Sequence, residues 1–312
     1  MTGYDALRTH AAWLDVSARG KIKLTGEDRA RLLHALTTNH IQQLTPGAGC
    51  YAFFLNDKGR ILADANVLCL ADHFLLDIEP ETRETLYQHL DHFIIADDVT
   101  LEDRTNATAG IAIEGPESAD VLRRAGATLP EQDYASTAWG DRLIARINST
   151  GSLGFFVFAP LEEKSALIAA LESAGAVPAD PEAFRIVRLE HGKPRYGDDI
   201  TDRFLAQEAN QPHALNFNKG CYLGQEIVER VRSRGQVHRV LMPLQLDTKT
   251  PPPPGSKLHI GETNVAEITS AAFSPALDRV VALGYVRTEH ARPHTAMTLG
   301  DVQAEVAAPA AG

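Results

Sequence analysis

The periodicity of the chain changes near Val240, and this change constrains the fold more than any other feature. Before it, strand-like and helix-like segments are mixed without the regular βαβ alternation of a doubly wound sheet, which favours an α+β fold. Beyond it, only strand patterns separated by turns recur, at 240–246, 257–260, 265–270 and 280–286. A single core stops growing at about 250–300 residues. We therefore expect a larger region at 1–239 and a small antiparallel barrel or sandwich at 240–312.

The first region contains two successive sets of strands and helices. The first set comprises strands at 22–26, 50–55, 60–70 and 74–78 and helices at 27–36 and from Pro80. The second comprises strands at 110–114, 142–147 and 153–158 and helices at 116–124 and 160–173. Both sets mix strands and helices, which favours an α+β arrangement in this region.

Composition limits the classes of function. The formal net charge is −11, so any nucleic-acid contact must come from a local basic patch. The chain has 3 cysteines, and their spacing fits neither a zinc ribbon nor a redox pair, so no metal site is predicted. We find no secretory signal and no apolar stretch of about 18 residues, and we expect a cytoplasmic protein without membrane contact.

Cys221 is the first candidate for chemistry. Gly220 and Gly224 lie on either side of it and allow the backbone to turn tightly or approach a ligand. A helix is expected over 223–231, which places the thiol close to a helix N-terminus and to Lys219, and both favour the thiolate. The alternative is a cysteine that acts only as a small buried apolar residue.

A second candidate lies on a helix predicted around 184–190. Phe184, Val187 and Glu190 recur at i, i+3 and i+6 and are expected to share a face. A carboxylate on an apolar face needs a hydrogen-bond donor, and the adjacent N–H and NH₂ groups of a pterin or guanine ring supply two. A salt bridge from Glu190 to Arg188 or Arg195 is the alternative.

Two further segments carry charged candidates. Asp64 falls in the middle of a predicted strand, where carboxylates are depleted. It either faces solvent or points into a cavity beside a substrate nitrogen. The stretch from 219 to 239 contains five Lys or Arg residues against two Glu residues, Arg230 among them. It is either a solvated face or a site for a polyglutamate tail, a phosphate or an RNA backbone.

The segment around Cys221 resembles the K-G-C-[FY]-x-G-Q-E signature of the YgfZ family. These proteins are folate-binding relatives of the glycine-cleavage T-protein (aminomethyltransferase), with mitochondrial members that serve iron–sulfur cluster assembly. The matching run is Lys219-Gly220-Cys221-Tyr222-Leu223-Gly224-Gln225-Glu226. Weaker similarities occur at 188–192, 230–236, 56–61 and 269–275. The resemblance therefore spans nearly the whole chain in order.

The resemblance implies two α+β lobes and a C-terminal antiparallel β-barrel around a central folate cavity. It implies that Glu190 holds the pterin, that Phe184 stacks on it and that Lys219 faces the acid groups of the folate. Asp64 matches one of two paired aspartates that the T-protein uses near the reacting nitrogen. The other position of this pair is Ala63 here.

These observations lead to three hypotheses. The first is a tetrahydrofolate-binding accessory factor for iron–sulfur cluster assembly or repair and for iron–sulfur-dependent tRNA modification, with iron–sulfur proteins as partners and Cys221 as a functional thiol. The second is an enzyme that transfers an aminomethyl or other one-carbon group to tetrahydrofolate, with Asp64 orienting the acceptor nitrogen or relaying its proton. The third is an RNA-binding module that contacts the backbone phosphates of an RNA, such as a tRNA. The contacting side chains would be Arg230, Arg232, Arg234 and Arg239.

Overall fold

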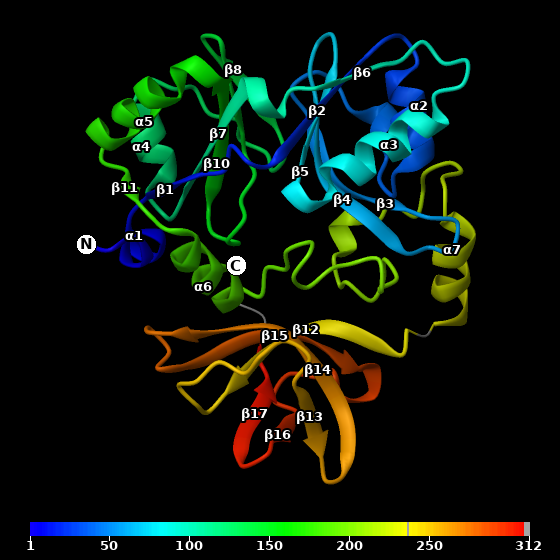
Figure 1. Cartoon of the computed structure of the whole chain (residues 1–312), viewed down its shortest axis with the longest axis vertical. Helices are drawn as coiled ribbons and strands as arrows, with labels where there is room; N and C mark the ends of the chain where they lie inside the picture. Colours follow the sequence, from blue (N-terminus) through cyan, green and yellow to red (C-terminus); the bar gives the residue numbers. More distant parts are fainter. Residues whose placement is uncertain (236, 309–312) are drawn as a thin grey trace.

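The computed structural model describes residues 1–235 and 237–308 and consists of three lobes (Figure 1). Two α+β lobes lie side by side, and a β-barrel lies below them in this view. The α+β architecture with a C-terminal barrel is therefore confirmed. Gln236 and residues 309–312, which the predicted segments include, lie outside the described residues.

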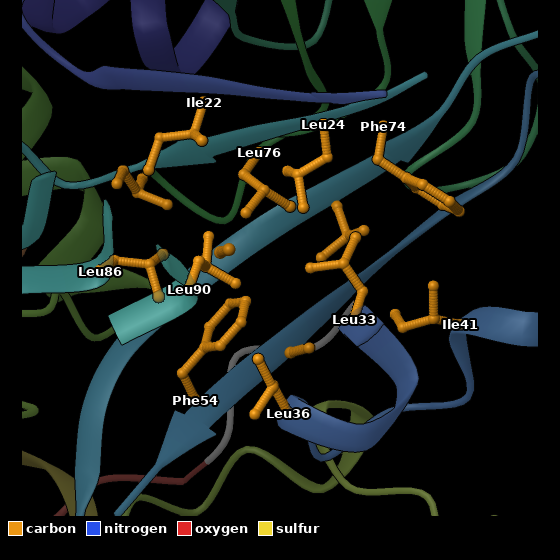
Figure 2. Close-up of a cluster of buried hydrophobic side chains, with 14 of the residues drawn as sticks. Ile22, Leu24, Leu33, Leu36, Ile41, Phe54, Phe74, Leu76, Leu86 and Leu90 are labelled. Atoms are coloured by element: carbon orange, nitrogen blue, oxygen red, sulfur yellow. The ribbon is translucent and has the colours of Figure 1, made fainter. Parts of the chain in front are cut away.

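The first lobe is a sheet with strand order β3-β4-β5-β2-β6. Its strands are β2 (Gly20–Thr25), β3 (Gly49–Leu55), β4 (Ile61–Cys69), β5 (Phe74–Ile78) and β6 (Thr100–Asp103). Helices α2 (Arg29–Leu36) and α3 (Arg83–Phe93) cover one face. Figure 2 shows the core between them, where Leu33, Leu86 and Leu90 from the helices meet Phe54 and Leu76 from the strands. The other face of the sheet packs partly against the second lobe and the segment after α6, and part of it lines a cavity.

The second lobe is a sheet with strand order β11-β1-β7-β10-β9-β8. Its strands are β1 (Ala12–Asp15), β7 (Thr108–Glu114), β8 (Ser136–Trp139), β9 (Arg142–Ala145), β10 (Gly154–Pro160) and β11 (Val177–Pro178). Helices α4 (Ser118–Arg124) and α5 (Lys164–Ser173) pack on one face. Because β1 follows the N-terminal helix α1 (Gly3–Thr9), the chain begins in this lobe, crosses to the first and returns.

The barrel is closed, with strand order β12-β15-β14-β13-β16-β17. Its strands are β12 (Arg239–Leu246), β13 (Lys257–Ile260), β14 (Thr263–Ser274), β15 (Arg279–Arg287), β16 (Ala296–Leu299) and β17 (Val302–Val306). Closure decides between the barrel and the sandwich that the sequence left open. The last two strands were not predicted, because their short apolar runs are interrupted by polar residues.

The segment between the lobes and the barrel contains two helices and a long loop (Figure 1). Helix α6 (Pro181–Glu190) follows the N-cap residue Asp180, whose carboxylate accepts a hydrogen bond from the N–H of Ala183. Helix α7 (Gln225–Arg234) begins after Gly224, whose φ is +82°. A Cβ at Gly224 would lie 2.7 Å from the carbonyl oxygen of Asn56, so the glycine is required for this close approach.

Candidate active site in the central cavity

A cavity of about 380 Å³ lies where the two α+β lobes meet the segment that follows them. Its size falls in the range of small-molecule sites. Side chains from the lobes that line it include Leu14, Val16, Arg19, Tyr51, Asp64, Asn66, Glu79, Asn148, Ser149 and Phe156. The segment from α6 onward adds Phe184, Arg185, Arg188, Lys193, Arg195, Asp198, Gln211 and His213.

Asp64 lies on the wall of this cavity because of strand alternation. Ala63 and Ala65 point into the helix-covered core, so Asp64 and Asn66 point to the opposite face of β4. The Tyr51 hydroxyl donates a hydrogen bond of 2.7 Å to Oδ2 of Asp64. Asp64 is only 8% exposed. Burial, with the nearby charge of Glu79, raises the pKa of Asp64 to about 6, although the Tyr51 hydrogen bond opposes the shift.

Aromatic rings form much of the remaining wall. Tyr51 stacks on His213 with ring centroids 5.2 Å apart. Phe156 and Phe184 also line the cavity, and the Arg19 guanidinium lies 5.6 Å from the centroid of the Phe156 ring. Flat faces of this kind suit a planar heteroaromatic ligand.

Buried ion pairs hold the arginines of the cavity in place. Arg19 donates from Nη2 to Asp77 at 2.8 Å and also pairs with Glu79. Arg188 donates from Nη1 to the fully buried Asp199 at 2.7 Å. Because each guanidinium is already bound to carboxylates of the chain, these side chains shape the site more than they offer free charge.

Glu190 does not line the cavity, contrary to the placement expected from the sequence. Its Oε1 accepts hydrogen bonds of 2.6 Å from the Tyr4 and Ser274 hydroxyls, and its Oε2 pairs with Arg8. The carboxylate thus joins α1, α6 and β14, and the Glu190 side chain is 4% exposed. The ion pair with Arg8 takes the place of the expected salt bridge to Arg188 or Arg195, and contact of Glu190 with a pterin stays a prediction.

Lys219 also lies away from the cavity. Its ammonium donates hydrogen bonds to the carbonyl oxygens of His34 and Thr37 at the end of α2. Burial lowers the pKa of Lys219 to about 8. The side chain therefore caps a helix C-terminus, where a cation stabilises the orphan carbonyls, and does not face the cavity.

Helix α7 lies at the edge of the molecule, beside the end of the β3–β4 hairpin (Figure 1), and Arg230 belongs to this helix. Cys221 is exposed and lies four residues before Gln225, where α7 begins two residues later than predicted. Arg230 donates to Glu226 at 3.0 Å on the helix surface. Neither residue lines the cavity. The expectation that positions 190 and 221 meet across a single pocket is wrong.

Of the predicted site residues, the cavity brings together Asp64 and Phe184. Sequence reasoning missed Tyr51, His213 and Lys193, which come from three separate segments. Tyr51 had a detectable signal, because it lies on the strand predicted at 50–55 that pairs with the strand of Asp64. His213 and Lys193 lie in irregular segments, where spacing carries no information about direction.

Family models match both parts of the chain. The GCVT N-terminal domain matches residues 2–219, and the glycine cleavage T-protein C-terminal barrel domain matches residues 239–310. The chain belongs to the glycine cleavage T-protein family. The barrel match begins at Arg239, where β12 begins in the structure.

Individual relatives support the same family. An aminomethyltransferase of Streptomyces coelicolor is 31% identical, with the alignment covering 93% of this chain and 82% of the relative. An aminomethyltransferase of Rubrobacter xylanophilus is 30% identical over 92% of this chain and 78% of the relative. The crystal structure of the glycine cleavage system aminomethyltransferase from Bartonella henselae superposes with a TM-score of 0.90, at 24% identity and covering 98% and 87% of the two chains, which shows the T-protein fold.

These comparisons support the T-protein family and do not single out its YgfZ branch, so that narrower assignment stays a prediction. In the described part of the chain no helix is long and apolar enough to span a bilayer. Among the same residues no cluster of His, Cys, Asp and Glu side chains could hold a metal ion.

Proposed function

We propose that this chain is a tetrahydrofolate-dependent one-carbon transferase, and specifically an aminomethyltransferase. The observation that carries the proposal is the buried carboxyl of Asp64 on the cavity wall, whose pKa is raised to about 6. Relatives that bear the name aminomethyltransferase cover most of this chain and support it.

The lining of the cavity fits a reduced pterin. The rings of Tyr51, Phe156 and Phe184 offer apolar faces, and the side-chain amides of Asn148 and Gln211 offer donors and acceptors to a polar ring edge. Tetrahydrofolate, when bound, supplies a ring nitrogen that accepts the one-carbon unit. The volume of about 380 Å³ suits a pteridine better than a macromolecular segment.

The residues of the chain would contribute acid–base chemistry at one atom. With a pKa of about 6, the Asp64 carboxyl is mostly ionised at pH 7 and can accept a proton or a hydrogen bond from a ligand nitrogen at Oδ1. Tyr51 holds Oδ2, which leaves Oδ1 for the ligand. Position 63, the other member of the aspartate pair, is alanine in this chain. Asp64 would therefore act without a carboxylate at the preceding residue.

Turnover tests this proposal. We expect the protein to pass the methylene carbon of an aminomethylated lipoyl carrier to tetrahydrofolate, with release of ammonia and the free carrier thiol. Asp64→Asn should lower the rate by about a hundredfold or more, as loss of an acid–base group does. Asp57→Asn, in the exposed turn after β3, is the control. Tetrahydrofolate binding without any turnover would contradict the transferase proposal.

A second candidate is the accessory role in iron–sulfur cluster assembly or repair and iron–sulfur-dependent tRNA modification. The exposed thiol of Cys221, in a run that resembles the YgfZ signature, favours it. Cells carrying Cys221→Ala should lose aconitase activity and tRNA methylthiolation under this role. Full activity of both would dismiss it.

The RNA-binding hypothesis has less support. Arg230 and Arg232 pair with Glu226 and Glu229 on the same helix. Arg239 is bound to Glu208. These pairs reduce the charge that is free to meet phosphates, and the Arg234 side chain lies outside the described part of the structure.

A further inference from the structure

Lys193 differs from the other cations that line the central cavity. Four arginines of the lining are paired with carboxylates of the chain, namely Arg19 with Asp77, Arg185 with Glu182, Arg188 with Asp199 and Arg195 with Glu79. In the described part of the chain, no carboxylate oxygen lies within 4.0 Å of the Lys193 ammonium. The lining therefore contains one cation without a counter-charge.

Backbone hydrogen bonds hold the main chain of Lys193, three residues after the end of α6. Its N–H donates to the carbonyl oxygen of Arg188 at 2.7 Å, and its own carbonyl oxygen accepts from Nη1 of Arg188 at 3.1 Å. Gly192 before it has a φ of +65°, and Pro194 after it has a restricted φ. These contacts fix the backbone of Lys193 at the cavity, and its side chain is part of the cavity lining.

The surroundings of Lys193 do not compensate its charge. Burial lowers the pKa of Lys193, and the distant charges of Glu114 and Asp64 only partly oppose this. Glu114 is unable to move closer, because its carboxylate accepts hydrogen bonds from the backbone and hydroxyl groups of Ser149 and Thr150. An ammonium group held partly away from water without a partner is costly, and a ligand that carries an anion removes this cost.

We propose that Lys193 determines ligand specificity by binding a carboxylate of the ligand in the cavity. The inference rests on the proposed function for the rest of the ligand. The carboxylate belongs either to the glutamyl tail of the folate or to a small amino-acid substrate that binds beside it. A carboxylate matches an ammonium group through a charge-assisted hydrogen bond.

Calorimetric titration of Lys193→Met tests the pairing. We expect this variant to bind the carboxylate-bearing ligand about tenfold to hundredfold more weakly than the wild type, because one charge-assisted bond is lost. Lys193→Arg should retain most of the affinity. Lys257→Met is the matched control, since it removes the same charge from an exposed position on the barrel.

The choice of ligands separates the two sources. If the tail is the partner, tetrahydrofolate loses affinity for Lys193→Met, whereas a tetrahydropterin without the glutamyl group binds both proteins equally. If an amino acid is the partner, tetrahydrofolate is unaffected, and glycine added to the folate complex loses affinity instead. Equal affinity of wild type and Lys193→Met for tetrahydrofolate and for glycine would overturn the inference and leave the proposed function standing.

A second measurement does not depend on tetrahydrofolate binding. The lysine side chains are chemically methylated with ¹³C and observed by NMR. The signal that disappears in Lys193→Arg is assigned to Lys193. Titration with p-aminobenzoylglutamate and with glycine should shift this resonance saturably, while the Lys257 resonance stays in place. A Lys193 resonance that shifts with neither p-aminobenzoylglutamate nor glycine would overturn the inference. This outcome is independent of tetrahydrofolate binding, whose failure would contradict the proposed function instead.

Discussion

Replacing Asp64 with asparagine should change how the stability of the protein depends on pH. Folding raises the pKa of this carboxyl from 3.8 to about 6 because the group leaves water. This rise in the pKa of Asp64 corresponds to about 3 kcal/mol in the free energy of unfolding. Because the pKa is higher in the folded protein than in the unfolded chain, the protonated carboxyl contributes to the free energy of unfolding. This contribution is fully present below the unfolded pKa and is lost as pH rises through the folded pKa. The wild type should therefore lose about 3 kcal/mol relative to Asp64→Asn between about pH 4 and pH 7.

The assay is urea unfolding of both proteins across that pH range. The difference in unfolding free energy between them cancels the titration of every other group that the two proteins share. Asparagine can still accept the Tyr51 hydrogen bond, so the fold should survive. Asp57→Asn is the control, because this exposed carboxyl remains in water in both states. A difference between wild type and Asp64→Asn that stays constant with pH would refute the argument that the cavity desolvates Asp64.

Three other variants test neighbouring parts of the structure. Tyr51→Phe removes a hydrogen bond that lowers the pKa of Asp64, so the Asp64 carboxyl carbon should titrate at higher pH by ¹³C NMR; an unchanged or lower pKa would contradict this. Glu190→Gln should cost about 1–3 kcal/mol in urea unfolding, because Arg8 loses its counter-charge, and should leave tetrahydrofolate affinity unchanged; a large loss of affinity would return Glu190 to the site. Lys219→Met should destabilise the protein by roughly 1–3 kcal/mol without weakening tetrahydrofolate binding, because two carbonyl groups at the end of α2 lose their donor.

The periodic parts of the sequence predicted many of the strands and helices, whereas the arrangement of the lobes followed from the family resemblance. The turn Asn56-Asp57-Lys58-Gly59 placed the hairpin of β3 and β4 correctly, and Gly59 has a φ of +69° there. Strand alternation also gave Asp64 its direction, since its neighbours Ala63 and Ala65 belong to the core. Period-2 patterns fix which face of the strand a side chain occupies, but the sequence left open whether the face of Asp64 meets solvent or a cavity.

Helical spacing was less reliable for the site. Residues six apart on a helix differ by about 120° around its axis, so Phe184 and Glu190 need not face the same way. Phe184 faces the cavity, whereas Glu190 points to α1 and β14. No local pattern reports that Tyr4 and Ser274, 186 and 84 residues away from Glu190, converge on its carboxylate.

Loop contacts were beyond prediction for a related reason. Lys219 reaches the carbonyl oxygen of His34, which lies 185 residues earlier in the chain. The expected position of Lys219 beside a folate depended on sequence proximity to a motif, whereas tertiary packing places it against the end of α2. Lys193 was missed because it follows α6 in an irregular segment.

The central claim is that the cavity between the lobes binds a folate, and a cavity-filling variant tests it most directly. Ala18 is exposed and lines the cavity in the turn between β1 and β2, so Ala18→Trp adds an indole ring without disturbing the core. Ala71→Trp, in the exposed turn between β4 and β5, is the control. By calorimetric titration, tetrahydrofolate should bind the wild type and Ala71→Trp with the same affinity and Ala18→Trp at least about tenfold more weakly, a loss of about 1.4 kcal/mol. Unchanged affinity for Ala18→Trp, or no binding to the wild type, would contradict the claim.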